Sequence, residues 1–279
     1  MQGEAEPRKE QDIYQPFVFM LGTDRNPCGR DVFSQKGRIF IIVDGTGSGA
    51  DPSENETPES VKQIIDNAKQ LSKLLLDTDD VERLDPNSAF LKIIIDHHHV
   101  KWIGRGGSVV GVVSTATASG FKNPEYGDMD ASLKKPITAC EHCFSIDRTV
   151  SLTQEGRIAP FESDYFEYSP QSQINFVIMG SDGGLEFLIH TKTFQQHLTY
   201  PQNYQAVYDA LALSNSQDEQ ALERQSSIVL SPLTNWLEEI VRTGDYVRFN
   251  QVMKELSTEL ATNPPEVDDD ATLAIIPIT

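Results

Sequence analysis

Three short acidic motifs contain the aspartates that are candidates for catalysis or metal binding. They are Val43-Asp44-Gly45-Thr46-Gly47-Ser48-Gly49, Gly180-Ser181-Asp182-Gly183-Gly184 and Asp268-Asp269-Asp270-Ala271-Thr272. Each adjoins an apolar run of β type, so each aspartate is expected at a strand end. Hard divalent cations prefer carboxylate oxygens, and a neighbouring glycine lets the backbone turn and offer a carbonyl oxygen to the same ion. The motifs therefore predict an oxygen-ligand metal site, although any one of them alone is also typical of an ordinary turn.

Two other groups of metal-binding residue types lie elsewhere in the chain. Cys140-Glu141-His142-Cys143 has C-x-x-C spacing, but a structural zinc site needs about four ligands. Apolar alternation on either side of these cysteines favours a strand flanked by two small, half-buried residues over zinc or redox chemistry. Ile95-Asp96-His97-His98-His99 reads as a polar turn between two strands, and an accessory metal contact from His97 or His99 stays open.

Composition and charge exclude several classes of function. The chain has 279 residues, 38% of them apolar, which suits a globular core. A formal net charge of −19 argues against nucleic-acid binding, because such proteins usually show a basic face. There is no apolar run of roughly 18 residues for a membrane span and no secretory signal near the start. Three cysteines are too few for a disulfide framework, so we expect a cytoplasmic protein that binds no membrane.

The elements expected to position the motifs are mainly strands, followed by helices. Residues 1–12 read as a flexible polar tail, and residues 13–279 as a single domain. Thr57 before Pro58 is a good N-cap, and apolar residues at helical spacing predict an amphipathic helix over 58–76. The order of the elements predicts an α+β arrangement. Strands are expected at 17–21, 31–33, 38–43, 90–95, 108–114, 143–152, 174–179 and 272–278, and further helices at 204–213, 233–241 and 247–260.

In order, strand-D-G-x-G-x-G-helix, strand-S-D-G and a terminal D-D-A-T-strand resemble the signatures of the metal-dependent protein phosphatases of type 2C, the PPM family. The motifs most resemble those of the bacterial SpoIIE-like and RsbX-like branch, where a G-D-hydrophobic segment occupies the place of Arg30-Asp31-Val32-Phe33. The resemblance implies a four-layer αββα sandwich of two antiparallel sheets flanked by helices. This sequence departs from the pattern at Ser48, where the branch has histidine, at Gly184, where leucine is usual, and at Ser145-Ile146-Asp147-Arg148, which replaces a G-D-S-R string.

The resemblance also implies a set of metal ligands. Asp44 would bridge two ions, Mn²⁺ or Mg²⁺, and Gly45 would offer its carbonyl oxygen to one of them. Asp182 and Asp269 would hold the other ion, and Asp269 is chosen because it stands three residues before Thr272, as in the family's terminal motif. Two such ions lower the pKa of a shared water, so that hydroxide can attack phosphorus near neutral pH.

Two further roles follow from the same resemblance and from residue chemistry. Asp31 would orient the attacking water from outside the ligand set. Arg25 or Arg30 could bind the phosphate, because a guanidinium offers two parallel donors, although solvation at the surface is the simpler role for each. Residues 116–136 and 214–225 match no motif and are expected to determine substrate specificity.

The implied function is a phosphoprotein phosphatase that hydrolyses phosphoserine or phosphothreonine, with a phosphorylated protein as its partner. Two alternatives stay open. One is a catalytically weak or inactive phosphatase-like binding module. The other is a DHH-type phosphoesterase, suggested by Asp96-His97-His98 after a strand, although the upstream D-x-D motif of those enzymes is missing.

Overall fold

The computed structural model describes residues 15–22, 30–45, 57–77, 89–96, 99–105, 108–114, 143–146, 162–167, 174–181, 183–184, 190–200, 232–267 and 270–278. Its strands are β1 (Phe17–Leu21), β2 (Val32–Lys36), β3 (Ile39–Asp44), β4 (Ala89–Asp96), β5 (His99–Arg105), β6 (Ser108–Ser114), β7 (Cys143–Ile146), β8 (Glu162–Glu167), β9 (Ile174–Ser181) and β10 (Ala271–Pro277). Its helices include α1 (Pro58–Asp77), α3 (Lys192–His197) and α6 (Tyr246–Thr262), with a further helix over residues 232–243.

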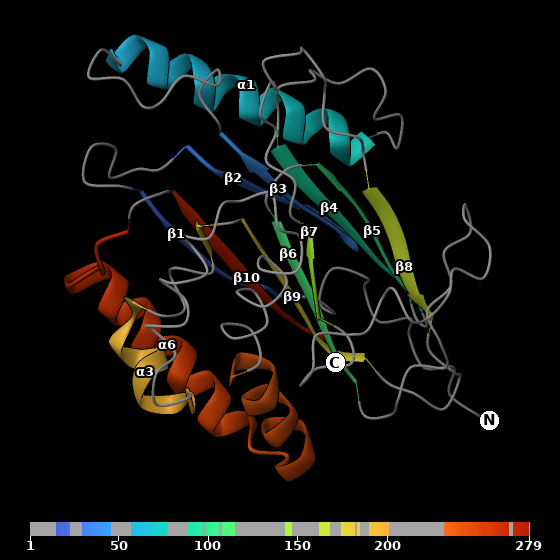
Figure 1. Ribbon diagram of the computed structural model, residues 1–279, viewed down its shortest axis with the longest axis vertical. Helices are drawn as coiled ribbons and strands as arrows, with labels where there is room; N and C mark the ends of the chain where they lie inside the picture. Colours follow the sequence, from blue (N-terminus) through green and yellow to red (C-terminus); the bar gives the residue numbers. More distant parts are fainter. Residues whose placement is uncertain are drawn as a thin grey trace, which may run out of the picture.

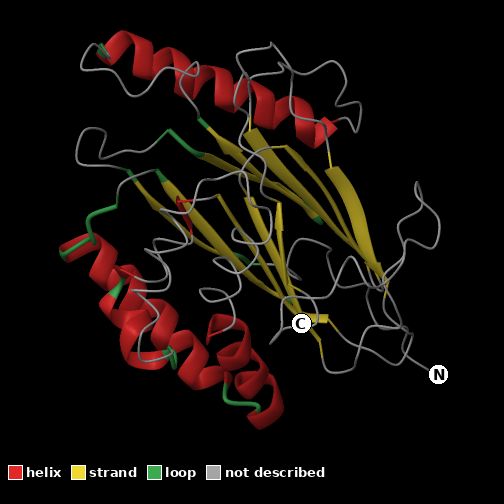
Figure 2. Ribbon diagram, viewed as in Figure 1, coloured by secondary structure: helices red, strands yellow, loops and turns green. Residues whose placement is uncertain are grey.

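The strands form two antiparallel sheets that lie face to face between layers of helix. One sheet has the order β1-β10-β9-β6-β7 and the other the order β2-β3-β4-β5-β8. Helix α1 covers the outer face of the second sheet, and α3 and α6 lie on the far side of the first (Figure 1). Figure 2 shows the resulting succession of helix, sheet, sheet and helix. The α+β fold expected from the sequence, with two antiparallel sheets flanked by helices, is confirmed.

The core between the sheets follows from the alternation of side chains along each strand. Phe40 and Ile42 of β3 point inward from one sheet, and Val177 and Met179 of β9 point inward from the other. Residues at every second position share a face of a sheet, so each strand presents one apolar set to this core. The register of the sheets is therefore fixed by burial, because a slip of one residue would turn these side chains outward.

The outer face of the second sheet is covered by α1. Ala68, Leu71 and Leu75 of the helix pack against Ile41 and Val43 of β3, which point outward. The helix begins as its N-cap predicts. The Thr57 hydroxyl accepts a hydrogen bond from the Ser60 amide at 3.2 Å, and the Ser60 hydroxyl accepts one from the Thr57 amide at 3.0 Å. These two contacts satisfy amides that have no partner within the helix.

Among the described residues, α3, the helix over 232–243 and α6 cover the outer face of the first sheet. Trp236 and Leu237 from the helix over 232–243, and Phe249 and Val252 from α6, pack against the sheet in one large apolar cluster that also includes Phe176. The ring of Phe249 lies 5.1 Å from that of Phe176, measured between centroids. Aromatic burial on this scale is a major source of stability.

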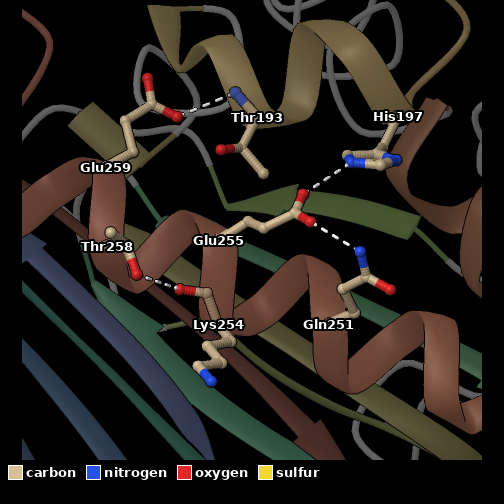
Figure 3. Close-up of polar contacts among 7 residues, drawn as sticks. All are labelled: Thr193, His197, Gln251, Lys254, Glu255, Thr258 and Glu259. Carbon is tan, nitrogen blue, oxygen red and sulfur yellow. Dashed lines mark hydrogen bonds and ion pairs between the residues drawn. The ribbon is translucent and has the colours of Figure 1, made fainter.

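Helix α3 is attached to α6 by polar contacts. The carboxylate of Glu259 accepts hydrogen bonds from the amides of Lys192 at 2.7 Å and Thr193 at 2.8 Å, at the start of α3. One turn earlier on α6, Glu255 contacts the His197 ring at 3.0 Å and accepts a hydrogen bond from Gln251 at 2.8 Å. Figure 3 shows these side chains along the two helices.

Several sequence predictions of individual elements are confirmed. The helix expected at 58–76 is α1, that at 233–241 is the helix over 232–243, and that at 247–260 is α6. The turn expected at Lys36-Gly37 is present, with Gly37 at a φ of 58°. Residues 1–12 and the helix expected at 204–213 lie outside the described residues, and the single domain over 13–279 stays a prediction.

Strand β8 and helix α3 were not predicted from the sequence. The β8 sequence, Glu162 to Glu167, holds three acidic residues among its six, and the strand lies at the edge of its sheet. Edge strands carry charge because it discourages pairing with other chains, and this weakens the apolar alternation on which prediction depends. Helix α3 has six residues, too few for a helical period to be recognised.

Candidate functional site

The three acidic motifs adjoin strand ends at one end of the sandwich. β3 ends at Asp44, and its partner β2 begins directly after Asp31. Because Val32 pairs with Val43, the same register places Asp31 opposite Asp44. In the other sheet, β9 ends at Ser181, and its partner β10 begins at Ala271.

Alternation along the strands determines which of these side chains turn inward. Asp44 shares its face with Phe40 and Ile42, whose side chains lie between the sheets. Asp31 lies at the next position beyond Phe33 on the same face and is buried. In the first sheet, Thr272 lies on the face of Ala274, which also points between the sheets. The end of the inter-sheet core is thus lined by polar side chains.

The second and third motifs are in direct contact. The backbone amide of Thr272 donates a hydrogen bond to the Ser181 hydroxyl at 2.9 Å, and both residues are buried. A methyl group at Gly184 would lie 2.5 Å from the carbonyl oxygen of Thr272, and one at Gly183 would collide with the carbonyl oxygen of Asp270. Glycine is required at both positions because the two backbones approach this closely.

The first motif is joined to the third through Arg30. The backbone amide of Arg30 and its Nε atom both donate to Oδ2 of Asp270, at 2.9 Å and 2.8 Å. A methyl group at Gly45 would collide with the carbonyl oxygen and Cβ of Arg30. The backbone of the Asp44-Gly45 turn therefore lies directly against the residue that holds Asp270.

The predicted site residues fall into two groups. Asp44 is half-buried, and Asp31 and Gly45 are buried, at the strand ends just described. Asp182 and Asp269 lie outside the described residues, so their roles stay predictions. Among the described residues no group of three or more His, Cys, Asp and Glu side chains is placed to hold a metal ion.

The arginines expected near phosphate have different outcomes. Arg25 lies outside the described residues. The Arg30 side chain is not solvated at the surface, because it is only 14% exposed. It forms an ion pair with the Asp270 side chain, which is 3% exposed. Arg30 and Asp270 were not expected to pair from the sequence. They are 240 residues apart, and nothing local in a single sequence links them.

The Asp96–His99 segment lies at the opposite end of the sheet. Asp96 pairs with His99 in the last rung between β4 and β5, as expected for a turn between two strands. Asp44 pairs with Ala89 at the other end of β4. At the usual rise per strand residue, the Asp44–Ala89 pair is roughly 23 Å from the Asp96–His99 pair. At this distance His99 cannot contact a metal ion bound at Asp44. His97 lies outside the described residues, so an accessory contact from it stays a prediction. Cys140 lies outside the described residues, and Cys143 begins β7.

The donor atoms at this end suit a divalent cation. Two carboxylates on opposed positions of neighbouring strands repel each other, and burial adds to that cost. A cation bound at Asp44 offsets both terms, and Asp44 with the Gly45 carbonyl oxygen supplies the oxygen ligands that Mg²⁺ and Mn²⁺ prefer. Gly45 is buried and has no room for a side chain, because the carbonyl oxygen and Cβ of Arg30 lie against it.

The fold of this chain is similar to solved structures, whereas its sequence matches no known family. No family model matches the chain, and no curated protein matches it. A crystal structure of RsbX in complex with magnesium aligns over 96% of both chains, with 12% identity and a TM-score of 0.38. The serine/threonine phosphatase PstP of Mycobacterium tuberculosis aligns over 95% of this chain and 99% of its own, with 10% identity and a TM-score of 0.35.

A third similar structure is PppA, a regulatory component of a secretion system in Pseudomonas aeruginosa. It aligns over 96% of this chain and 99% of its own, with 11% identity and a TM-score of 0.37. At these identities and scores the likenesses carry no weight for function. Separately, no helix within the described ranges is long and apolar enough to cross a membrane.

Proposed function

We propose that this protein is a metal-dependent phosphoprotein phosphatase that removes phosphate from phosphoserine or phosphothreonine, with Mn²⁺ or Mg²⁺ as cofactor. The observation that supports it best is the contact between the three motifs. Gly45 lies against Arg30, Arg30 binds Asp270, and Gly183 lies against Asp270. Motifs far apart in the sequence are thereby held at one end of the sandwich.

The ligands proposed for two ions are Asp44, the carbonyl oxygen of Gly45, Asp182 and Asp269. Asp44 would contact both ions, and Asp182 and Asp269 would complete the set from the other sheet. When bound, the two cations would offset charge on the phosphoryl oxygens and make a nearby water a stronger acid. Asp270 is left out of the set because its Oδ2 already accepts two hydrogen bonds from Arg30.

The chain's own side chains would orient the reactants. Asp31 is buried beside Asp44, and its carboxylate would accept a hydrogen bond from the attacking water and direct that water toward phosphorus. No cysteine or serine nucleophile is needed in such a displacement, because water attacks directly. The carboxylate ligands would also fix the positions of the cations, and with them the place where the phosphoryl oxygens would bind in line with the water.

Phosphate release from a phosphoserine peptide tests the proposal. Metal-free protein should be inactive, and addition of Mn²⁺ should restore turnover. Asp44→Asn and Asp182→Asn should each lower kcat at least about a hundredfold, because each removes a charged ligand. Asp77→Asn is the matched control, since Asp77 is 59% exposed at the end of α1 and pairs with Lys36 away from the site.

The outcomes separate the alternatives. Wild-type protein that binds Mn²⁺ but releases no phosphate from any phosphopeptide would favour the inactive binding module. Activity that survives both Asp44→Asn and Asp182→Asn would place the chemistry elsewhere. Turnover confined to phosphodiester substrates would contradict a phosphoprotein phosphatase.

A further inference from the structure

The pair between Arg30 and Asp270 connects the two sheets at the end where the motifs lie. Arg30 lies two residues before the start of β2, in one sheet. Asp270 lies directly before the start of β10, in the other sheet. The backbone amide and Nε of Arg30 both donate to a single oxygen, Oδ2 of Asp270. Two donors from one residue fix both the position and the direction of the acceptor better than a single contact does.

Burial makes this connection stiff. The Asp270 side chain is 3% exposed and that of Arg30 14%. If the buried Asp270 carboxylate lost its contact with the Arg30 guanidinium, its negative charge would be left uncompensated. Alternative arrangements of the two side chains are therefore strongly disfavoured. Screening by salt is also weak at such a site. The pair therefore resists displacement in a way that an exposed ion pair does not.

The backbones of all three motifs are packed against these two residues. Gly45 has no room for a side chain because the Arg30 backbone lies against it, and Gly183 has none because of the Asp270 carbonyl oxygen. One contact thus fixes the turn after Asp44, and the other fixes the chain next to Asp182. Asp269 is adjacent in sequence to Asp270 itself.

We propose that Arg30 is a positioning residue for the metal site: through Asp270 it sets the spacing between the ligands from the two sheets. This inference rests on the proposed function. It gives Arg30 a different role from the phosphate contact considered from the sequence, because the Nε and amide of Arg30 are directed at Asp270. Loss of the pair should weaken cation binding even though neither residue is a ligand.

Isothermal titration of metal-free protein with Mn²⁺ tests this inference, with thermal unfolding and phosphopeptide kinetics measured on the same samples. Arg30→Met keeps much of the aliphatic stem and removes the donors. It should weaken Mn²⁺ binding about tenfold or more, as for other residues that orient ligands. Arg30→Lys keeps the cation and should recover part of the affinity. Asp270→Asn should resemble Arg30→Met.

The matched control is Lys36→Met, which breaks the exposed ion pair between Lys36 and Asp77. It should leave Mn²⁺ affinity at the wild-type value. If Arg30→Met does not fold, Arg30→Lys and Asp270→Asn decide the question, since each retains hydrogen-bonding capacity at the pair.

Three results would overturn the inference. A folded Arg30→Met with wild-type Mn²⁺ affinity and only a lower unfolding temperature would make the pair merely structural. A higher KM for phosphopeptide with unchanged Mn²⁺ affinity would make Arg30 a phosphate contact. If the wild type itself bound no Mn²⁺, the proposed function would fail and the inference with it, and this result differs from the first two.

Discussion

The hydroxyl of Ser181 accepts a hydrogen bond from the backbone amide of Thr272, 91 residues later, at 2.9 Å and away from solvent. It joins the end of β9 to the start of β10, where the regular pairing of the two strands stops. A buried amide without a hydrogen-bond acceptor destabilises the fold. The Ser181 hydroxyl provides the acceptor at a position where the regular pairing of the strands has ended. It also keeps two of the acidic motifs together.

Ser181→Ala should lower the free energy of unfolding by about 1–3 kcal/mol, because the Thr272 amide is left buried without its acceptor. Urea unfolding followed by circular dichroism measures the change. Thr258→Ala on α6 is the control: its hydroxyl also makes one hydrogen bond, to Lys254, but in an exposed position (Figure 3), and its loss should cost less than about 0.5 kcal/mol. Equal effects of the two substitutions would contradict the role given to Ser181.

Gly45→Ala should be more damaging than Gly37→Ala. At Gly45 a methyl group collides with the Arg30 backbone, which cannot give way easily, so we expect a loss of about 1–3 kcal/mol or more. At Gly37 nothing lies within 4 Å, and only the φ of 58° opposes a side chain, at a cost of about 1 kcal/mol. Thermal unfolding of the two variants in the absence of metal decides the order, and the reverse order would mean that Arg30 does not lie against Gly45.

Thr272→Val should leave the metal-free protein at least as stable as the wild type. Thr272 is fully buried, and its Oγ1 has no hydrogen-bond partner among the described residues. Exchange of an unsatisfied hydroxyl for a methyl group of similar shape should add about 1 kcal/mol. Thr272→Ser, which keeps the hydroxyl and deletes the methyl group, should instead cost about 1 kcal/mol. A marked loss of stability in Thr272→Val would show that the hydroxyl has a partner in solution.

The contact between α3 and α6 predicts a pH dependence. The pKa of Glu255 is lowered from its ordinary value of 4.5, first by the hydrogen bond from Gln251 and then by His197. A carboxyl group with a lowered pKa in the folded state stabilises the protein above its unfolded pKa, and the contribution is lost as the pH falls through the folded pKa.

Wild-type protein should therefore exceed Glu255→Gln in stability near neutral pH, and the difference should shrink as the pH falls below 4.5. Urea midpoints measured across this range test the prediction. Gln251→Ala, which removes the largest cause of the shift, should reduce the pH-dependent part of the difference. A difference that grew as the pH fell would have the wrong sign.

The fold was predictable to the extent that burial leaves a local pattern. Val61, Ala68 and Leu75 recur at helical spacing, and Thr57 caps the helix, so α1 could be placed from sequence almost to the residue. The polar edge strand β8 left no such pattern, because half of its residues are acidic. Local sequence predicts an element well when its apolar residues recur with a clear period, and poorly when they do not.

The site was predictable in its chemistry and only partly in its geometry. Asp44 could be placed at a strand end from the apolar run before it, and Asp31 from the strand after it. The pair of Arg30 with Asp270 could not be predicted, because contact between residues 240 apart depends on how the two sheets meet. The collision that makes Gly45 necessary has the same origin, since it needs the Arg30 backbone.

We propose that the three acidic motifs together bind divalent cations at one end of the sandwich. Crystals soaked in Mn²⁺ and measured at the manganese absorption edge test it directly. We expect anomalous difference peaks within coordination distance of Asp44, the Gly45 carbonyl oxygen, Asp182 and Asp269. Absence of a peak at this end, or peaks only at another place such as the Cys140–Cys143 segment, would rule out the proposed metal site.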